Sequence, residues 1–263
     1  MSDYIDSSTF DNLVLHSLNN KRHVIPNTVY YDMEYYNCLY KELSKRDLIS
    51  NYKREFRRYS HNRIKICSVA SSARLCFLNF VYNNYTFEKD LIIQGVAGGI
   101  AHLDAFDNID TYIECKCREI TNKHTDKLST AYESQLKECF NIVNIRNNIN
   151  DKKIELFLPD FGIPREESIY NLSFDFKQLI CHLLGLANNN GGKLQYIFFT
   201  PNNHLIELNK SCQKLYENLR SEITEIWNCP VIQTMCSKYK ITLLQPIYIQ
   251  ISHVRDFVIE QLF

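Results

Sequence analysis

The sequence is poor in glycine and proline and has no long apolar run. Only 7 glycines and 6 prolines occur among 263 residues, which leaves little room for disordered linkers, collagen-like repeats or low-complexity segments. The longest apolar run is far below the ~20 residues that span a bilayer, so we expect no membrane segment. The stretch "GVAGG" (95–99) has neither the lysine and hydroxyl residue of a Walker motif nor the spacing of a dinucleotide fingerprint. The common nucleotide-binding loops are therefore excluded.

The charge balance and the cysteine spacing exclude further classes. Thirty basic and thirty acidic side chains cancel to a formal charge of zero, so any polyanion must be held by a local patch. Ten cysteines occur at irregular spacing, with no CxxC pair and no recognisable signal sequence. This predicts a reduced, cytoplasmic chain instead of a disulfide framework or a structural zinc site.

What the sequence has is enough apolar surface for a core, with 45% hydrophobic residues, and an alternation of helical and strand-like segments. Residues 1–30 show no clear period. We predict helices in these segments: 33–59, from Ser71 or Ser72 to about 81, from Asp126 through "DKLSTAYESQLKECFNIVNI", "SFDFKQLICHLLGLA", His204 to Trp227, and "HVRDFVIEQLF". We predict strands in these segments: "FEKDLIIQ", "IAHLDAF", "TYIECKC", "KLQYIFFT" and "ITLLQPIYIQI", the last interrupted at Pro246.

This alternation predicts an α/β fold with a mixed sheet covered by helices on both faces. We expect a mainly helical N-terminal extension over residues 1–66, followed by one compact domain over residues 67–263.

Charged side chains occur in two of the predicted strands, where burial is expected. Because side chains alternate along a strand, Glu114 and Lys116 share one face, and Cys115 and Cys117 share the other, which packs into the core. Asp104 lies in the preceding strand, joined by the turn-forming "DNID" (107–110).

Whether these polar faces coincide depends on the pairing register. Pairing of Phe106 with Thr111 would put Asp104 beside Ile113, whereas pairing of Phe106 with Tyr112 places Asp104 opposite Glu114. A shared site requires the second register or a bulge.

In that register two carboxylates and a lysine converge in a buried region, at a cost of several kcal/mol unless the charges are paired or bind metal. A divalent cation keeps two neighbouring carboxylates ionised, and oxygen ligands suit Mg²⁺ or Mn²⁺. Lys116 beside such a cation would orient or help to deprotonate water and stabilise charge on a phosphate. The alternative is a partly exposed salt bridge at a sheet edge.

The pattern D-x9-E-C-K, read from Asp104 through Glu114 and Lys116, resembles the active-site signature of the PD-(D/E)XK nuclease superfamily. Leu103 stands where that signature often has proline. The resemblance extends over residues 70–201 to a group of uncharacterised bacterial restriction-endonuclease-like proteins. It implies a restriction-endonuclease-like sheet, in which a helix like "SSARLCFLNF" precedes the metal-binding strands and a unit like "DFKQLICHLLGLANNNGGKLQYIFFTP" closes the sheet.

The resemblance also implies a metal site. Glu88, Asp104 and Glu114 would hold one or two Mg²⁺ ions, with Mn²⁺ as a substitute, and the Cys115 carbonyl would add a ligand. For Glu88, an exposed carboxylate at a strand end is the alternative.

Further roles follow from the same resemblance. Lys116 would assist the attacking water, and Gln135, on the helix after the catalytic strand, would be a catalytic glutamine. Cys139 occupies the position where a tyrosine often follows that glutamine, and Glu119 would be an outer carboxylate.

The expected function is therefore a metal-dependent DNA nuclease, of restriction or related defence type, acting as a homodimer, with RNA not excluded as substrate. The rivals are a catalytically silent nuclease-like module for nucleic-acid binding or assembly, and a hydrolase of small phosphorylated substrates. Basic residues are candidates for phosphate contacts or for a solvated helix face: Lys41, Lys45, Lys53, Arg54, Arg57, Arg58, Lys123 and Lys127.

Three other groups are weighed against structural roles. Asp107 and Asp110 suit a turn, and His182 suits a buried, hydrogen-bonded histidine. His102 shares the alternation of Asp104, which leaves a site-lining role open for it.

Overall fold

A six-stranded mixed sheet organises the chain, with strand order β1-β2-β3-β7-β8 and with β9 paired to β7. The computed structural model describes residues 5–18, 33–52, 55–56, 65–68, 70–121, 124, 127–142, 146–148, 152–163 and 172–260. The strands are β1 (Thr86–Ile92), β2 (Ile100–Phe106), β3 (Thr111–Lys116), β7 (Gly192–Thr200), β8 (Ile241–Leu243) and β9 (Ile247–Gln250). The predicted α/β class with a mixed sheet is confirmed.

The sheet begins as an antiparallel meander and continues with parallel strands. β1 pairs with β2 and β2 with β3 in antiparallel fashion, whereas β7 runs parallel to β3, β8 and β9. Pro246 falls between β8 and β9, as expected for a residue that cannot donate to a ladder. All of the predicted strands are therefore present.

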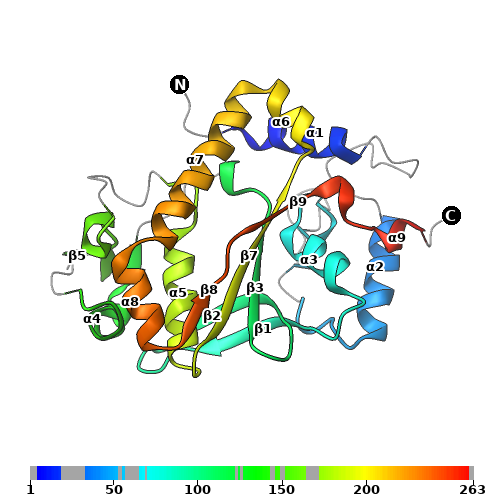
Figure 1. The fold of residues 1–263 in the computed structure, drawn as a ribbon. Helices are drawn as coiled ribbons and strands as arrows, with labels where there is room; N and C mark the ends of the chain where they lie inside the picture. The colour runs from blue at the N-terminus through cyan, green and yellow to red at the C-terminus, as the bar shows by residue number, and fades with distance from the viewer. Residues whose placement is uncertain are drawn as a thin grey trace.

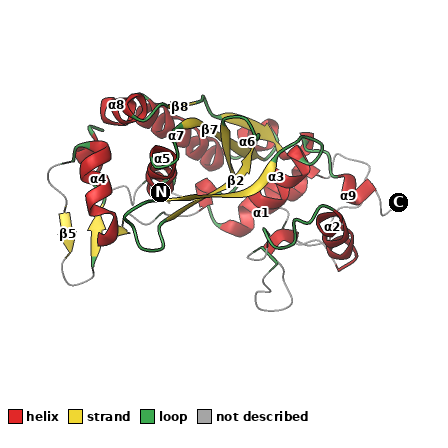
Figure 2. Ribbon diagram, turned by 90° about the horizontal axis from the view of Figure 1, so that it is seen from below, coloured by secondary structure: helices red, strands yellow, loops and turns green. Residues whose placement is uncertain are grey.

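Helices α3 (Ser72–Phe80) and α5 (Phe176–Ala187) cover opposite faces of the sheet (Figures 1 and 2). On the α3 face, the rings of Phe77 and Phe87 meet with centroids 5.6 Å apart. On the α5 face, Gly185 lies so close to β2 that an added Cβ would be 2.6 Å from the Ala101 Cβ. The apolar crowding that the sequence shows in both helices thus serves the two faces of one sheet.

The remaining helices extend these two layers. α2 (Met33–Lys45) and α9 (Phe257–Glu260) lie on the side of α3, and α4 (Glu133–Phe140), α7 (Lys210–Trp227) and α8 (Pro230–Lys238) lie on the side of α5 (Figure 1). α1 (Ser7–Leu18) packs beside α6 (Asn203–Leu208). A small second sheet joins β4 (Lys127–Ser129), β6 (Lys153–Glu155) and β5 (Arg146–Asn148) in that order.

Helix α8 and strands β5 and β6 were not predicted, and the predicted elements need correction at four other places. The segment after Asp126 begins as strand β4, because Leu128 pairs with Ile154 in the small sheet, and the helix begins only at Glu133. The helix predicted from His204 to Trp227 is divided at Asn209, whose side chain accepts the N–H of Cys212 at 3.0 Å and caps α7.

The other two corrections concern the N-terminal part. α1 was not predicted, because its apolar residues show no clear period. The helix predicted over 33–59 ends at Lys45, and residues 53–54 and 57–59 lie outside the described part of the chain.

In the part of the chain that the structure describes, no helix combines the length and the apolar character needed to cross a membrane.

Candidate active site

The register of β2 and β3 is the one that a shared site requires. Phe106 pairs with Tyr112 and Ala105 with Ile113, which places Asp104 opposite Glu114 in the next position. The described pairing stops there, and the Asp104 Oδ2 atom accepts the backbone N–H of Cys115 at 2.6 Å. Asp104 therefore lies where β2 and β3 separate, and its carboxylate takes over a hydrogen bond of the sheet.

A kink in β1 lies beside Asp104. Glu88 has a φ of 54° in the middle of the strand, a left-handed conformation that costs roughly 1–2 kcal/mol for a residue other than glycine. The β1–β2 ladder runs from Phe87↔Ala105 to Lys89↔Leu103 and omits the Glu88 position between them. Strain of this kind often marks functional sites.

The kink exchanges the two faces of β1. Phe87 packs against α3, whereas Leu91 lies against Gly185 of α5, although an even spacing would keep both side chains on one face of a regular strand. Glu88 and Asp104 thus lie where the side chains of β1 and β2 change from one face of the sheet to the other. Both residues are half-buried.

The carboxylates near this point raise one another's pKa. Burial, followed by the charges of Glu55 and Glu114, raises the pKa of Glu88 to about 8. Burial, followed by the charges of Glu114 and Glu88, raises the pKa of Asp104 well above its ordinary value. Both shifts mean that these carboxylates favour protonation unless a cation offsets their repulsion.

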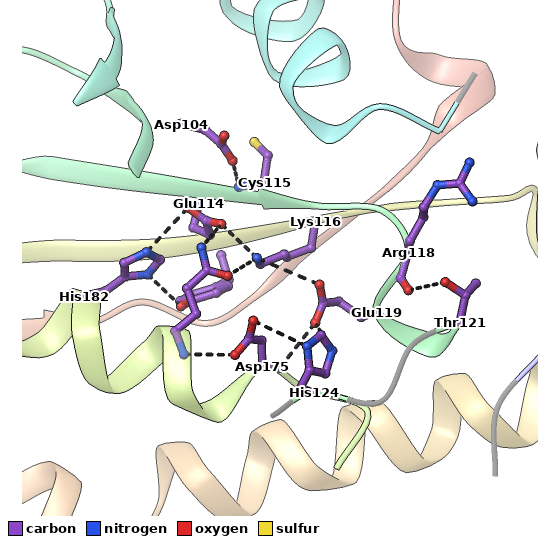
Figure 3. Close-up of polar contacts among 12 residues, drawn as sticks. Asp104, Glu114, Cys115, Lys116, Arg118, Glu119, Thr121, His124, Asp175 and His182 are labelled. Carbon is purple, nitrogen blue, oxygen red and sulfur yellow. Dashed lines mark hydrogen bonds and ion pairs between the residues drawn. The ribbon is translucent and has the colours of Figure 1, made fainter. Parts of the chain in front are cut away.

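Glu114 and Lys116 lie on the opposite side of β3, toward α5 (Figure 3). The Glu114 Oε1 atom is 2.9 Å from Lys116 Nζ and accepts the Gln178 Nε2 donor at 2.8 Å. Lys116 Nζ also donates to Gln178 Oε1 and lies 3.9 Å from Glu119 Oε1. Although burial lowers the pKa of Lys116, Glu114 and Glu119 outweigh it and raise that pKa above its ordinary value. Lys116 is therefore an ammonium in this arrangement.

His124 extends this network by a further pair of carboxylates. Its Nε2 atom is 3.1 Å from Glu119 Oε2, and its Nδ1 atom is 3.4 Å from Asp175 Oδ2. Asp175 caps α5 by accepting the Gln178 N–H at 2.9 Å. Burial lowers the pKa of His124, but the contacts with Asp175 and Glu119 raise it to about 10, so the ring is an imidazolium that is ion-paired with both carboxylates.

The predicted glutamine and the glutamine in contact with Lys116 are different residues. Gln135 lies in α4, where its Oε1 atom accepts from Cys139 Sγ at 3.8 Å and from Asn188 Nδ2 at 3.3 Å. Gln178, in the first turn of α5, holds Glu114 and Lys116 instead. The signal for Gln178 was its place three residues after the capping Asp175 in "DFKQ", where the first turn of the helix faces β3.

The cysteines of β3 lie as predicted. Cys115 and Cys117 are buried in the core, and the Cys115 thiol is hydrogen-bonded to the Cys76 thiol. The Cys115 N–H points to Asp104, and the carbonyl of a strand residue points to the same edge as its N–H. The carbonyl predicted as a ligand is therefore on the Asp104 edge of β3.

His182 and Asp107 have the structural roles that the sequence indicates for them. His182 is 1% exposed, with Tyr196 Oη 2.8 Å from Nδ1 and the His102 carbonyl oxygen 2.9 Å from Nε2, and burial lowers its pKa, so it is neutral. Asp107 Oδ1 accepts three backbone N–H groups of the hairpin turn. His102 Nδ1 is hydrogen-bonded to Asp90 Oδ1 at the surface.

The donor chemistry of the site fits a hard cation only in part. Glu88 and Asp104 supply oxygen ligands at a point of excess negative charge, as Mg²⁺ requires, but the Glu114 carboxylate is held by Lys116 and Gln178. Across the described residues, no three His, Cys, Asp or Glu side chains form a group that would hold an ion. Glu114 would have to exchange these contacts to join Glu88 and Asp104.

No protein-family model, no curated protein and no solved structure matches this chain.

Proposed function

We propose that the chain is a metal-dependent nuclease that hydrolyses phosphodiester bonds in DNA. The observation that carries the proposal is the β2–β3 register, in which Phe106 pairs with Tyr112 and Asp104 comes opposite Glu114 beside Glu88. Glu88 and Asp104 thus lie side by side where the strands separate, whereas Glu114 and Lys116 lie on the other side of β3 (Figure 3) and would have to turn toward them to complete the arrangement that the PD-(D/E)XK resemblance implies.

The arrangement of elements supports the finer fold assignment, a restriction-endonuclease-like sheet. Helix α3 precedes β1, β2 and β3, and the α5–β7 unit then adds a parallel strand next to β3. This is the order that the resemblance implies for the helix before the metal-binding strands and for the unit that closes the sheet.

Glu88 and Asp104 would hold Mg²⁺ or Mn²⁺, with the Cys115 carbonyl at the same edge and Glu114 joining after its contacts are exchanged. The cation would supply Lewis-acid activation of the phosphate and of a water. Lys116, as an ammonium, stabilises negative charge on the phosphate, and Gln178 holds its amine in place through Oε1. A neutral amine would be needed for Lys116 to act as a base, so charge stabilisation is the role that its ion pairs favour.

The surface that would bind the polymer stays a prediction. Lys45 is 2.5 Å from Glu42 and Lys127 is 3.5 Å from Glu155, so these two lysines already have acidic partners. The other expected basic residues, apart from Lys41, lie outside the described residues: Lys53, Arg54, Arg57, Arg58 and Lys123. A restriction or defence role and a homodimer that cuts both strands belong to the same proposal.

The experiment is an incubation of purified chain with supercoiled DNA, linear DNA, single-stranded DNA, RNA and nucleotides, each with Mg²⁺, Mn²⁺ or EDTA. We expect metal-dependent cleavage of DNA by the wild type and none by Asp104→Ala or Lys116→Ala. Cleavage of nucleotides alone would favour the hydrolase of small phosphorylated substrates. The nuclease proposal is lost if no polymer is cut or if both variants cut equally well.

A second function has a specific observation in its favour. Lys116 and Glu114 bind each other and Gln178 in a buried network. In this arrangement the two charged side chains stabilise the fold and leave none of their charge directed at a substrate. A silent nuclease-like module for nucleic-acid binding or assembly predicts that Lys116→Ala, if folded, leaves every activity of the protein unchanged.

A further inference from the structure

A buried histidine on α5 connects two strands of the sheet. His182 Nδ1 lies 2.8 Å from Tyr196 Oη in β7, and Nε2 lies 2.9 Å from the His102 carbonyl oxygen in β2. Burial lowers the pKa of His182, so the ring is neutral and carries one proton. Because a carbonyl oxygen can only accept, that proton is on Nε2, and Nδ1 accepts the Tyr196 hydroxyl. We call Tyr196, His182 and the His102 carbonyl the histidine bridge.

The histidine bridge passes β3 at Glu114. Tyr196 pairs with Glu114 in the parallel β3–β7 register, and His182 Nε2 lies 3.7 Å from Glu114 Oε2. Figure 3 shows the His182 ring beside Glu114 on the α5 side of β3. The bridge therefore reaches from the strand on one side of β3 to the strand on its other side, at the residue that lies opposite Asp104.

The His102 carbonyl points toward β3 from beyond the end of the β2–β3 pairing. The Ile93 N–H donates to the Gly99 carbonyl at 2.9 Å. Because carbonyls alternate between the two edges of a strand, the His102 carbonyl points to the other edge of β2, on which β3 lies. The β2–β3 pairing ends at Ala105↔Ile113. The imidazole N–H from α5 thus occupies the place that a donor from β3 would have in a continuous ladder.

Two side-chain hydrogen bonds therefore replace the ladder where β2 and β3 separate. On β3, the Cys115 N–H donates to Asp104 Oδ2 at 2.6 Å. On β2, the His102 carbonyl accepts from His182. A buried backbone group that loses its partner is unfavourable, so the separation of the two strands depends on both bonds.

The close approach of α5 to β2 brings the imidazole to this carbonyl. Gly185 follows His182 by three residues and so lies on the same face of the helix. An added Cβ at Gly185 would lie 2.6 Å from the Cβ of Ala101, the residue before His102. The absence of a side chain at Gly185 lets the His182 ring reach the strand backbone.

We propose that His182 is a positioning residue of the candidate active site: the histidine bridge holds β2 apart from β3, and this separation places the Asp104 carboxylate at the Cys115 N–H. His182 acts through the backbone of β2 and touches no substrate. The effect on catalysis rests on the proposed function, whereas the bridge and its effect on Asp104 do not.

The test compares three variants of the full chain. His182→Leu removes both hydrogen bonds of the ring, and Tyr196→Phe removes only the hydroxyl that orients it while keeping the buried aromatic ring. Ser17→Ala is the control, because Ser17 is also buried and its Oγ atom also binds a backbone group of another segment, the Asn202 N–H at 2.8 Å, but it lies on α1. Tyr196→Phe keeps the test valid if His182→Leu does not fold.

The first readout is hydrogen exchange of the Cys115 amide without metal, measured by NMR relative to the amides of α7 in the same sample. Exchange should be about tenfold faster in His182→Leu, as for the loss of one hydrogen bond, and faster by a smaller factor in Tyr196→Phe. Ser17→Ala should leave the ratio unchanged. Cys115 protection at the wild-type level in both bridge variants overturns the proposal, whether or not the chain cuts DNA.

The second readout is the nicking of supercoiled DNA in Mg²⁺. His182→Leu should lower kcat by about tenfold or more through misplacement of Asp104, with KM unchanged because His182 does not contact DNA. An unchanged kcat in a variant with faster Cys115 exchange overturns the positioning role. Faster exchange in the variants of a chain whose wild type cuts no DNA would confirm the bridge and overturn the proposed function alone.

Discussion

The Glu114 carboxylate is stabilised by Lys116 and Gln178 on one side and repels the carboxylates of Asp104 and Glu88 on the other. On the α5 side, Lys116 and Gln178 satisfy it at 2.9 and 2.8 Å. On the side of the strand break, its charge raises the pKa of Asp104 and Glu88. At the scale of single residues, the site is therefore an incompletely neutralised set of charges, and a divalent cation at Glu88 and Asp104 would relieve the repulsion that remains.

His124 predicts a pH dependence of stability. Its pKa is about 10 in the folded chain against an ordinary 6.5, so its stabilising effect is fully present below pH 6.5 and is lost as the pH rises through 10. The charged groups around it are Glu119, Asp175 and Lys116. Burial raises the pKa of Asp175, but the contacts with His124 and Lys116 outweigh this and lower that pKa to about 2. The pKa of Lys116 is raised above its ordinary value, so Lys116 stays protonated between pH 6 and pH 10.

Urea denaturation of the wild type and His124→Gln should show a stability difference on the order of a few kcal/mol at pH 6 that shrinks toward pH 10. A difference that stays constant from pH 6 to pH 10 would mean that His124 is not charged in the folded chain.

At the scale of elements, the kink of β1 at Glu88 joins two packing surfaces. It lets Phe87 meet α3 and Leu91 meet α5 within one strand. The left-handed backbone is stored strain, which the packing on both sides maintains.

Substitution of Glu88 measures that strain. Glu88→Gly and Glu88→Ala both remove the carboxylate, but only glycine adopts a φ of 54° without steric cost. In metal-free urea denaturation, Glu88→Gly should be more stable than Glu88→Ala by about 1 kcal/mol. The reverse order would show that β1 is regular at this position.

The contact of α5 with β2 depends on Gly185. Alanine there would improve helix propensity by about 1 kcal/mol, but its Cβ would lie 2.6 Å from the Ala101 Cβ and 3.2 Å from the Leu91 Cβ. We expect Gly185→Ala to destabilise the chain by about 2 kcal/mol in thermal or urea unfolding, because overpacking outweighs propensity. A more stable variant would contradict this close approach.

The hairpin was predictable, and the contacts that surround it were not. Strand alternation and the turn, in which Asp107 accepts three backbone N–H groups, are local, so the sequence defines β2, β3 and the two possible registers. Gln178 lies 62 residues from Lys116 in sequence, and His124 comes from another segment. Their positions depend on how distant segments of the chain pack together, which no sequence periodicity encodes. For the same reason the sequence predicts Gln135, and not Gln178, as the glutamine beside Lys116.

At the scale of the whole molecule, the described N-terminal residues are bound to the rest of the chain. The Asp256 carboxylate accepts Tyr35 Oη and Arg74 Nη1, both at 2.9 Å, and thereby connects α2, α3 and the C-terminal segment. Arg118, just after β3, is 2.5 Å from Asp11 of α1. Tyr52 also packs against this part of the chain, because its ring centroid lies 6.2 Å from that of Phe77 in α3.

The most direct test of the nuclease proposal is the rate at which supercoiled DNA is nicked in Mg²⁺ by the wild type, Asp104→Asn and the control Asp90→Asn. Asp90 is a neighbouring β1 carboxylate at the surface, paired with His102. The account predicts nicking by the wild type and Asp90→Asn, abolished by EDTA, and a loss of at least about a hundredfold in Asp104→Asn, as for removal of a catalytic electrostatic group. Nicking by Asp104→Asn at the rate of Asp90→Asn, or no nicking by the wild type, would contradict it.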